Sequence, residues 1–269
     1  MSESAKIIVD MKDIAQYRDF AGHLADLARP IAKRYFRSDL TIIEKPDATP
    51  VTLADMEIET RIRDEIARVY PAHGVLGEEH DDTQLDAEWV WVIDPIDGTK
   101  AFTCGKPQFG TLVALTHRGE PVIGVIDQPI TDERWVGVKG RGATFNGQLM
   151  RARQHVKSLA DTIVLTTTPD LFDAPADAAA FARLKASCKG IYYGGDCYNY
   201  ALLAAGHVDL VIERGLKIVD FAAVVNPIVE AGGVACDWAG RALTIASDGT
   251  IVAAANQALA DEVLAVLAR

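Results

Sequence analysis

The sequence feature that most constrains the fold is the stretch Trp89 to Lys100, WVWVIDPIDGTK. Its beginning is apolar at every position, which predicts a strand buried on both faces. Two aspartates, Asp94 and Asp97, stand where this strand ends. An ionised carboxylate there is costly to desolvate unless a cation or several hydrogen-bond donors compensate it. The two aspartates are therefore either solvated at the strand end or bound to something positive.

The residues around the two aspartates favour a turn. Pro95 fixes the backbone and Gly98 relaxes it, so DPIDG is able to fold both carboxylates, with the Ile96 carbonyl, towards one point. A point lined by oxygen atoms suits a hard cation such as Mg²⁺. The alternative is an ordinary Asp-Gly turn in a hairpin, because both residues are common turn formers.

Composition limits the classes of function open to the chain. With 269 residues, 49% of them hydrophobic, it is long enough to bury a substantial core. A formal net charge of -11 and an isoelectric point near 5.0 argue against non-specific attraction to nucleic acid or an anionic membrane. Residues 1–29 lack the apolar core of a signal peptide, and no later segment reads as a membrane span. We expect a cytoplasmic protein with a small-molecule partner.

Cysteine and histidine spacing disfavours zinc chemistry. The four cysteines, at positions 104, 188, 197 and 236, form no CxxC pair, and the six histidines are scattered. Neither a disulfide framework nor a zinc site is therefore indicated.

The first half of the chain, residues 1–150, reads as α+β. Apolar residues recur every three or four positions over 11–37, which predicts a helix that Pro30 should bend or interrupt. A second helix is expected from Thr52, with Asp55 completing a capping box. Four segments separated by Gly or Pro then read as strands of an antiparallel sheet: VWVID, FGTLVALTH, PVIGVIDQP and RWVGVKG.

The second half, residues 151–269, alternates strands and helices. Strands are expected at TIVLTT and VDLVIE, and helices around DAAAFARLKA, YNYALLAAG and FAAVVNPIVEAGG. Pro227 should kink the last of these helices. The alternation predicts stacked layers of helix and sheet. The expected fold class is therefore α/β, layered as α+β in its first half, with residues 1–269 forming one domain around a shared core.

Two further places carry acids beside apolar runs. Glu78 and Glu79 follow a glycine in VLGEEH, and Asp220 opens an apolar helix in LKIVDFAAVV. Taken singly, the glutamates are explained as a solvated turn and Asp220 as a helix N-cap. Together with DPIDGT they indicate a shared site.

These segments resemble the inositol monophosphatase family of metal-dependent, lithium-sensitive phosphatases. The match runs in order along nearly the whole chain: VTLAD at 51–55, GEE at 77–79, DPIDGT at 94–99 and VDFAAVVNPIVEAGG at 219–233. The resemblance implies the layered α/β sugar-phosphatase fold, a homodimer, and two or three Mg²⁺ ions per site. It also implies the metal ligands, which are Glu78, Asp94, the Ile96 carbonyl, Asp97 and Asp220.

The resemblance further implies the catalytic residues. The threonine of DPIDGT pairs with the aspartate of the upstream T-x-x-D helix, here Thr99 with Asp55, to activate water, and Glu78 acts with them. Asp55 is also a capping residue, and the two roles are compatible. Gly98 and Thr99 open the next element, where their backbone N–H groups would hold phosphate oxygens. Because clustered carboxylates repel one another, we expect the site to be loose until metal binds.

Substrate preference is read from three stretches that resemble the histidinol-phosphate phosphatases of histidine biosynthesis: 94–115, 193–217 and 219–233. At position 219, inositol-hydrolysing members usually have tryptophan and this chain has valine. Histidinol phosphate carries an amine and an imidazole, so its pocket should offer carboxylates beyond those that hold metal. Asp196 and Glu213 are the candidates, with Lys217 near the phosphate. The alternatives are a helix N-cap for Asp196, a surface strand end for Glu213, and solvated side chains for Lys217 and Lys100.

Two other functions stay open. Within the same chemistry, the chain would be an inositol-1-phosphatase or a broad sugar or nucleotide monophosphatase. In a different class, it would be a silent family member that acts as a binding or regulatory module. The silent alternative is disfavoured because the GEE and DPIDGT acids, Thr99, Asp55 and Asp220 are all present.

Overall fold

The computed structural model describes residues 11–39, 42–44, 50–156 and 158–268. The α-helices in these residues are α1 Met11–Tyr35, α2 Leu53–Val69, α3 Thr99–Thr103, α4 Pro175–Ser187, α5 Asp196–Ala204, α6 Ile218–Glu230 and α7 Gln257–Leu267. The first nine strands are β1 Ile42–Glu44, β2 Pro50–Thr52, β3 Gly74–Gly77, β4 Trp89–Asp97, β5 Gly110–His117, β6 Glu120–Gln128, β7 Glu133–Val138, β8 Gly142–Phe145 and β9 Gln148–Leu149. The later strands are β10 Ile163–Thr166, β11 Gly190–Tyr193, β12 Leu210–Glu213, β13 Val234–Cys236 and β14 Ile251–Ala254, and the short 3₁₀ turns are η1 Leu159–Asp161 and η2 Pro169–Phe172.

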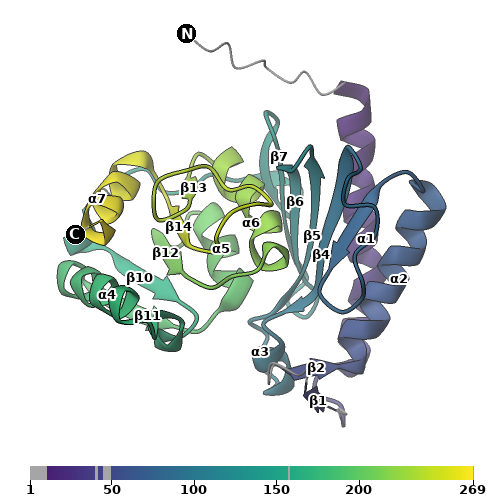
Figure 1. Cartoon of the computed structure of the whole chain (residues 1–269), viewed down its shortest axis with the longest axis horizontal. Coiled ribbons are helices and arrows are strands. Elements are labelled where there is room, and N and C mark those ends of the chain that lie inside the picture. Colours follow the sequence, from purple (N-terminus) through teal and green to yellow (C-terminus); the bar gives the residue numbers. More distant parts are fainter. Residues whose placement is uncertain (1–10, 40–41, 45–49, 157, 269) are drawn as a thin grey trace.

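The elements stack in layers, as Figure 1 shows. Helices α1 and α2 cover the outer face of a seven-stranded sheet, and α5 and α6 lie on its other face. A five-stranded sheet follows, with α4 and α7 outside it. No helix of the described residues has the length and apolar character needed to cross a bilayer. The layered α/β architecture predicted from the sequence is confirmed.

The seven-stranded sheet has the order β3-β4-β5-β6-β7-β8-β9. The four strands predicted for it pair antiparallel, as expected. Strand β3 differs, because it pairs with β4 in parallel. The chain between them returns to the start of the sheet, so both strands run the same way. The segment after β3, which carries Glu78 and Glu79, therefore begins at the same end of the sheet as the end of β4.

Helices α1 and α2 follow the predicted apolar stripes. On α2, Ile58, Ile62 and Ile66 are almost completely buried, and Thr52 is the N-cap rather than the first helical residue. Helix α1 continues through Pro30, so the expected interruption there is wrong. Pro30 is exposed, while Ile31 beside it is buried. Packing of the buried face on the sheet maintains the helix despite the missing backbone hydrogen bond.

Helix α6 packs with its backbone directly on the seven-stranded sheet. A Cβ at Gly124 of β6 would lie under 3.0 Å from the Ala223 carbonyl, and one at Gly137 of β7 would meet the backbone of Asn226 and Pro227 equally closely. Pro227 stands inside one continuous helix. It has no N–H to donate to the Ala223 carbonyl four residues earlier, and this is the carbonyl that lies on Gly124. Two glycines in the sheet thus make room for the proline turn.

The two halves of the chain share packing contacts. In the five-stranded sheet, of order β11-β10-β12-β14-β13, strand β10 is parallel to both neighbours and β14 antiparallel to both of its own. One hydrophobic cluster joins Leu112 and Ile126 of the first sheet to Phe221 of α6 and Val211 and Ala253 of the second. A single domain over residues 1–269 requires such a shared core, and it remains our expectation.

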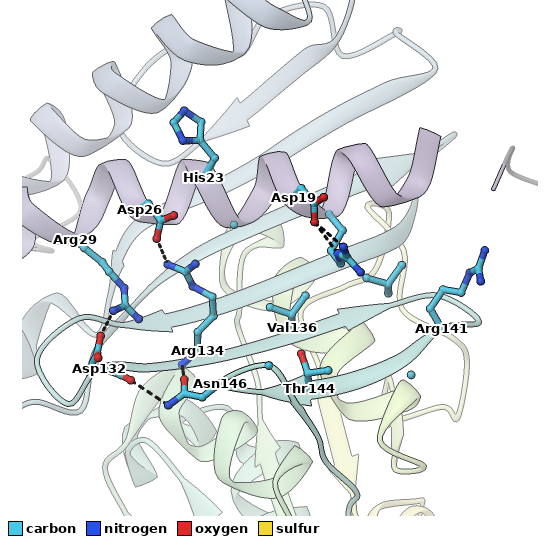
Figure 2. Close-up of a pocket in the computed structure, with 15 residues that line it drawn as sticks. Asp19, His23, Asp26, Arg29, Asp132, Arg134, Val136, Arg141, Thr144 and Asn146 are labelled. Atoms are coloured by element: carbon cyan, nitrogen blue, oxygen red, sulfur yellow. Dashed lines mark hydrogen bonds and ion pairs between the residues drawn. The ribbon is translucent and has the colours of Figure 1, made fainter. Parts of the chain in front are cut away.

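A charged groove between α1 and the β7–β8 hairpin ties the outer helix to the sheet (Figure 2). Two of its arginines are engaged by acids from across the groove: Arg29 pairs with Asp132, and Arg134 donates to Asp26 at 2.6 Å. Both arginines also reach Asp127, a carboxylate with 0% exposure, at 2.8 and 2.6 Å. Because Arg29 lies on α1 and Arg134 on β7, their shared hydrogen bonds to the buried Asp127 carboxylate fix the position of α1 relative to the sheet. The groove is therefore explained by attachment of α1.

The glycine contacts of α6 predict a stability effect. Gly137→Ala should lower the free energy of unfolding by about 3 kcal/mol, because the added methyl meets helix backbone that has no rotamer to change. Gly190→Ala is the matched control, since nothing lies within 4 Å of its Cβ position. The control should stay within about 0.5 kcal/mol of the parent chain. Urea unfolding of both variants is the measurement, and equal stability of the two would contradict the proposed contact.

Candidate metal centre and substrate pocket

A bulge in β4 brings the two aspartates of DPIDGT to one side of the strand. Asp94 pairs with Leu112 of β5 and Asp97 with Gly110, so three steps along β4 face two along β5. In a regular strand, residues three apart point to opposite faces, and the extra residue of a bulge cancels this alternation. Both carboxylates therefore point the same way, at the end of a strand whose last residues are largely buried.

Short-range hydrogen bonds fix the bulge. Asp94 Oδ1 accepts from the Ile96 N–H at 3.0 Å, and Thr99 Oγ1 donates to the Ile96 carbonyl at 3.0 Å. Gly98 adopts a left-handed φ of 84° as the N-cap of α3. A side chain there would be strained, and its Cβ would also lie 3.1 Å from Asp196. The turn-forming role expected of Gly98 is thus combined with close packing at the site.

Helix α6 adds the third carboxylate. Asp220 lies in its first turn, where Oδ2 accepts from the Lys217 N–H at 2.6 Å. One carboxylate oxygen from each of Asp94, Asp97 and Asp220 lies within 4.8 Å of the others. Side chains from distant parts of the sequence thus converge on one point, as the sequence predicted. We call these three residues the acidic trio.

Asp55 enters the same region from the first turn of α2. Its Oδ2 accepts from the Thr52 N–H at 2.8 Å and from the Thr52 hydroxyl at 2.6 Å, so the predicted capping box is present. Its Oδ1 is buried and has no hydrogen-bond partner. In the structure Thr99 donates to Ile96 instead, so its predicted pairing with Asp55 stays a prediction. A buried acceptor without a donor is unfavourable unless a bound group completes it.

Burial and mutual repulsion raise the pKa values of Asp55 and of the acidic trio. Desolvation is the largest cause for Asp94, followed by the charges of Glu78 and Asp97, and its pKa lies well above the ordinary value. The pKa of Asp97 is likewise raised well above its usual range, by burial first and then by Asp196. Burial raises the pKa of Asp55 to about 6 and that of Asp220 to about 7. All-oxygen donors that repel one another in this way fit a divalent hard cation.

Glu78 follows β3 and stands just outside the acidic trio. Its charge contributes to the raised pKa values of Asp55, Asp94 and Asp220, and Glu78 lines the same cavity as the trio. Its Oε1 lies 3.5 Å from the Lys217 ammonium. Lys217 thus contacts a predicted metal ligand, although its side chain is 55% exposed.

One cavity of about 280 Å³ joins the acidic trio to the predicted substrate residues. Glu78, Gly98, Thr99, Lys100, Asp196, Glu213 and Lys217 all line it. Asp196 is the first residue of α5, whose N-cap is Gly195, so the alternative of an N-cap aspartate is wrong. The pKa of Asp196 is raised to about 6, because the effect of burial exceeds the opposing effect of the nearby Lys100 charge. The structure therefore places an additional acid and an exposed lysine beside the trio.

Glu213 at the end of β12 is 2% exposed, so the alternative of a surface strand end is wrong. Its Oε1 accepts from the Thr167 N–H at 2.8 Å and its Oε2 from the Tyr200 hydroxyl at 2.9 Å. Burial raises its pKa, and these two donors oppose the rise. They hold the carboxylate in one orientation at the cavity wall.

Sequence reasoning missed Glu59, Thr167 and Tyr200. Glu59 is 0% exposed on α2, four residues after Asp55 and on the same helix face. Glu59 lies on the helix face that Ile62 and Ile66 continue, and this spacing was the sequence signal that Glu59 is buried. Thr167 and Tyr200 contribute a backbone amide and a hydroxyl to Glu213, and neither has a sequence signature.

Comparison with known proteins decides the family. The model of the inositol monophosphatase family matches residues 13–269. The chain belongs to this family. Its members include metal-dependent phosphatases with this layered fold, so the chain is a metal-dependent phosphatase, and the predicted fold and family are confirmed.

Individual relatives differ in the substrate that their names give. The chain is 46% identical over 220 residues to "Bifunctional phosphatase IMPL2, chloroplastic" of Arabidopsis thaliana, covering 81% of this chain and 63% of that protein. It is 34% identical over 245 residues to a histidinol-phosphatase of Chlorobaculum parvum, covering 91% and 93% of the two chains. A solved inositol monophosphatase from Zymomonas mobilis superposes with a TM-score of 0.87 at 41% identity, covering 97% and 100%. The family is therefore settled more firmly than the substrate.

The raised pKa values predict how pH and Mg²⁺ together affect stability. In the metal-free protein, folded-state pKa values above the ordinary 3.8 favour the protonated acids, so this stabilisation is present at low pH. It is lost as pH rises through about 6 for Asp55 and about 7 for Asp220. Mg²⁺ competes with these protons and should raise the melting temperature more at pH 8 than at pH 5.5. Differential scanning fluorimetry with and without Mg²⁺ checks this, and equal increments at both pH values would contradict it.

Proposed function

We propose that this phosphatase hydrolyses histidinol phosphate to histidinol and phosphate with Mg²⁺, as a step of histidine biosynthesis. The observation that carries the proposal is the presence of Asp196 and Glu213 in the cavity of the acidic trio. The trio accounts for a metal-held phosphate, whereas the two further acids suit a substrate with cationic groups. Similarity to histidinol-phosphatases supports the same choice.

For the metal centre we propose two or three Mg²⁺ ions, held by Glu78, Asp94, the Ile96 carbonyl, Asp97 and Asp220. Every donor in this set is oxygen, which Mg²⁺ prefers. When bound, such ions neutralise phosphate charge and make water a stronger nucleophile near neutral pH. The protein's part is to keep the carboxylates pointing inward, and the β4 bulge and the first turn of α6 do this.

Asp55 and Thr99 are proposed to orient water and take up its proton. The free Oδ1 of Asp55 is the acceptor, while Oδ2 stays on Thr52. A pKa of about 6 keeps Asp55 largely ionised at neutral pH and close to the range in which a base is effective. Thr99 would exchange its hydrogen bond to the Ile96 carbonyl for one within this pair, with Glu78 acting beside them.

For the substrate, we propose that Gly98 and Thr99 donate backbone N–H groups to phosphate oxygens at the cavity wall. Lys217 and the exposed Lys100 add positive charge to the same cavity. Asp196, which packs against Gly98, and Glu213 are further acids of the same cavity and would receive the ammonium and imidazole groups. A cation would also offset the desolvation that raises the pKa values of these two acids.

Asp55→Asn tests the proton acceptor. The change keeps an oxygen for the Thr52 cap but removes the basic oxygen, so kcat should fall about 100-fold or more while Mg²⁺ affinity stays within a few fold. Asp64→Asn on the exposed side of α2 is the control, and it should leave both quantities unchanged. The measurements are steady-state kinetics and Mg²⁺ titration calorimetry. Parallel loss of metal affinity and turnover would refute the assignment.

A substrate panel tests the proposed reaction. We expect phosphate release from histidinol phosphate, with Mg²⁺, to exceed that from inositol 1-phosphate and 3′-phosphoadenosine 5′-phosphate by about tenfold or more in kcat/KM, about 1.4 kcal/mol. Asp196→Asn should raise KM for histidinol phosphate more than for inositol 1-phosphate, which carries no cation. A tenfold preference for the inositol ester would instead favour the alternative of an inositol or broad monophosphatase.

The assembly and location implied by the family resemblance are also proposals. A homodimer would leave the acidic trio within one subunit, because Asp94, Asp97 and Asp220 already meet in a single chain. Analytical ultracentrifugation of the purified chain measures the oligomeric state. A cytoplasmic location is consistent with a small-molecule substrate of amino-acid biosynthesis.

A further inference from the structure

Glu59 lies completely buried on α2 and holds the segment that carries Glu78. Three consecutive backbone N–H groups converge on its carboxylate: those of Glu78 and Glu79 on Oε2 at 3.0 and 2.7 Å, and that of His80 on Oε1 at 3.2 Å. Successive amides around one anion form the arrangement by which backbone loops bind external anions. Here the anion is the protein's own side chain.

The rest of the contact is fitted around this carboxylate. Arg63, one turn further along α2, donates to Glu59 Oε1 at 2.7 Å and to the His80 carbonyl at 3.2 Å. The His80 ring reaches Thr60 on the same helix at 3.0 Å. A Cβ at Gly77 would lie under 3.0 Å from both the Glu59 carboxylate and the Arg63 guanidinium. The loop therefore approaches α2 as closely as its backbone allows.

We infer that Glu59 is a positioning residue that presents Glu78 to the metal centre. Helix α2 carries Asp55 in its first turn and Glu59 one turn later, so one rigid element sets the backbone of Glu78 relative to Asp55, and Glu78 lines the cavity of the acidic trio. Glu59 itself touches neither metal nor substrate in this assignment. The inference rests on the proposed function, because it concerns the affinity of the proposed Mg²⁺ site.

Glu59→Gln is the sharpest change. The two oxygens of Glu59 receive two donors each, and a glutamine of the same shape turns an NH₂ group towards one of these pairs. Two hydrogen bonds become donor–donor contacts, so the loop should detach. Loss of a group that orients a metal ligand typically costs about 10–100-fold in metal affinity.

Glu65→Gln is the matched control. Glu65 lies on the same helix, is 7% exposed, and accepts from Arg68 at 2.7 Å and from His23 at 2.9 Å. It therefore repeats the burial and arginine pairing of Glu59 away from the loop. A purely structural role for Glu59 predicts that both variants lose stability and that neither changes Mg²⁺ binding selectively.

The experiment measures two quantities on the parent chain and both variants. Amide hydrogen exchange over 77–80, without metal, should accelerate about tenfold or more in Glu59→Gln and stay unchanged in Glu65→Gln. Calorimetric titration with Mg²⁺ alone should show a Kd raised about tenfold or more in Glu59→Gln only. Unchanged exchange, or a Kd within twofold of the parent chain, would overturn the inference.

A second variant covers the case in which Glu59→Gln fails to fold. Gly77→Ala keeps the carboxylate and pushes the loop away from it, so it should show the same faster exchange and weaker Mg²⁺ binding. If Gly77→Ala also binds Mg²⁺ like the parent chain, the inference is wrong. Absence of Mg²⁺ binding by the parent chain would instead refute the proposed metal centre, and the metal-free exchange data would still decide whether Glu59 holds the loop.

Discussion

Repulsion among buried and half-buried carboxylates that lie close together is the constraint on which this site depends. Asp94, Asp97 and Asp220 bring oxygens within 4.8 Å of one another, and burial leaves little water to screen them. Part of the compensation is built in, because α2, α3, α5 and α6 all begin at this site and helix N-termini favour negative charge. The remainder comes from protons at low pH, and a bound cation would replace them at higher pH. Without a bound metal or cationic ligand, holding these ionised acids together lowers the stability of the folded protein.

The positions of the three acids depend on packing contacts made by residues that are far from them in the sequence. Asp220 is placed by α6, which lies with its backbone on Gly124 and Gly137 and so has little freedom to slide. Asp94 and Asp97 are placed by a bulge in the same sheet. The sheet is therefore the common reference for the acidic trio. This explains why a proline is tolerated inside α6, since the surface beneath it is shaped for that turn.

The sequence was sufficient for the layered fold, the main strands and the acids of the trio, because each left a periodic or turn-forming pattern. The sequence was insufficient where the conformation or burial of a residue depends on a partner that is distant in the chain. Pro30 predicted a bend or interruption and Pro227 a kink, and both prolines lie inside continuous helices that are packed on the sheet. The burial of Glu213 depends on Tyr200 and on the Thr167 amide, which no local pattern announces. From sequence alone, a charged residue that is buried because it accepts hydrogen bonds from backbone amides cannot be told from a surface residue. The loop that donates those hydrogen bonds is visible only in the structure.

The sequence indicated compatible capping and functional roles for Asp55 and offered capping as the alternative for Asp220, and the structure explains how one carboxylate is able to serve both. A carboxylate has two oxygens, and in both residues Oδ2 accepts the N–H of the residue three positions earlier, at 2.8 and 2.6 Å. The cap thereby fixes the side chain torsions and leaves Oδ1 to be aimed by the helix, and in Asp55 that oxygen is buried without a partner. Fixing one oxygen in advance reduces the entropy that metal or water binding would otherwise cost. In this fold the backbone N–H of the residue three positions earlier thus orients the carboxylates of Asp55 and Asp220.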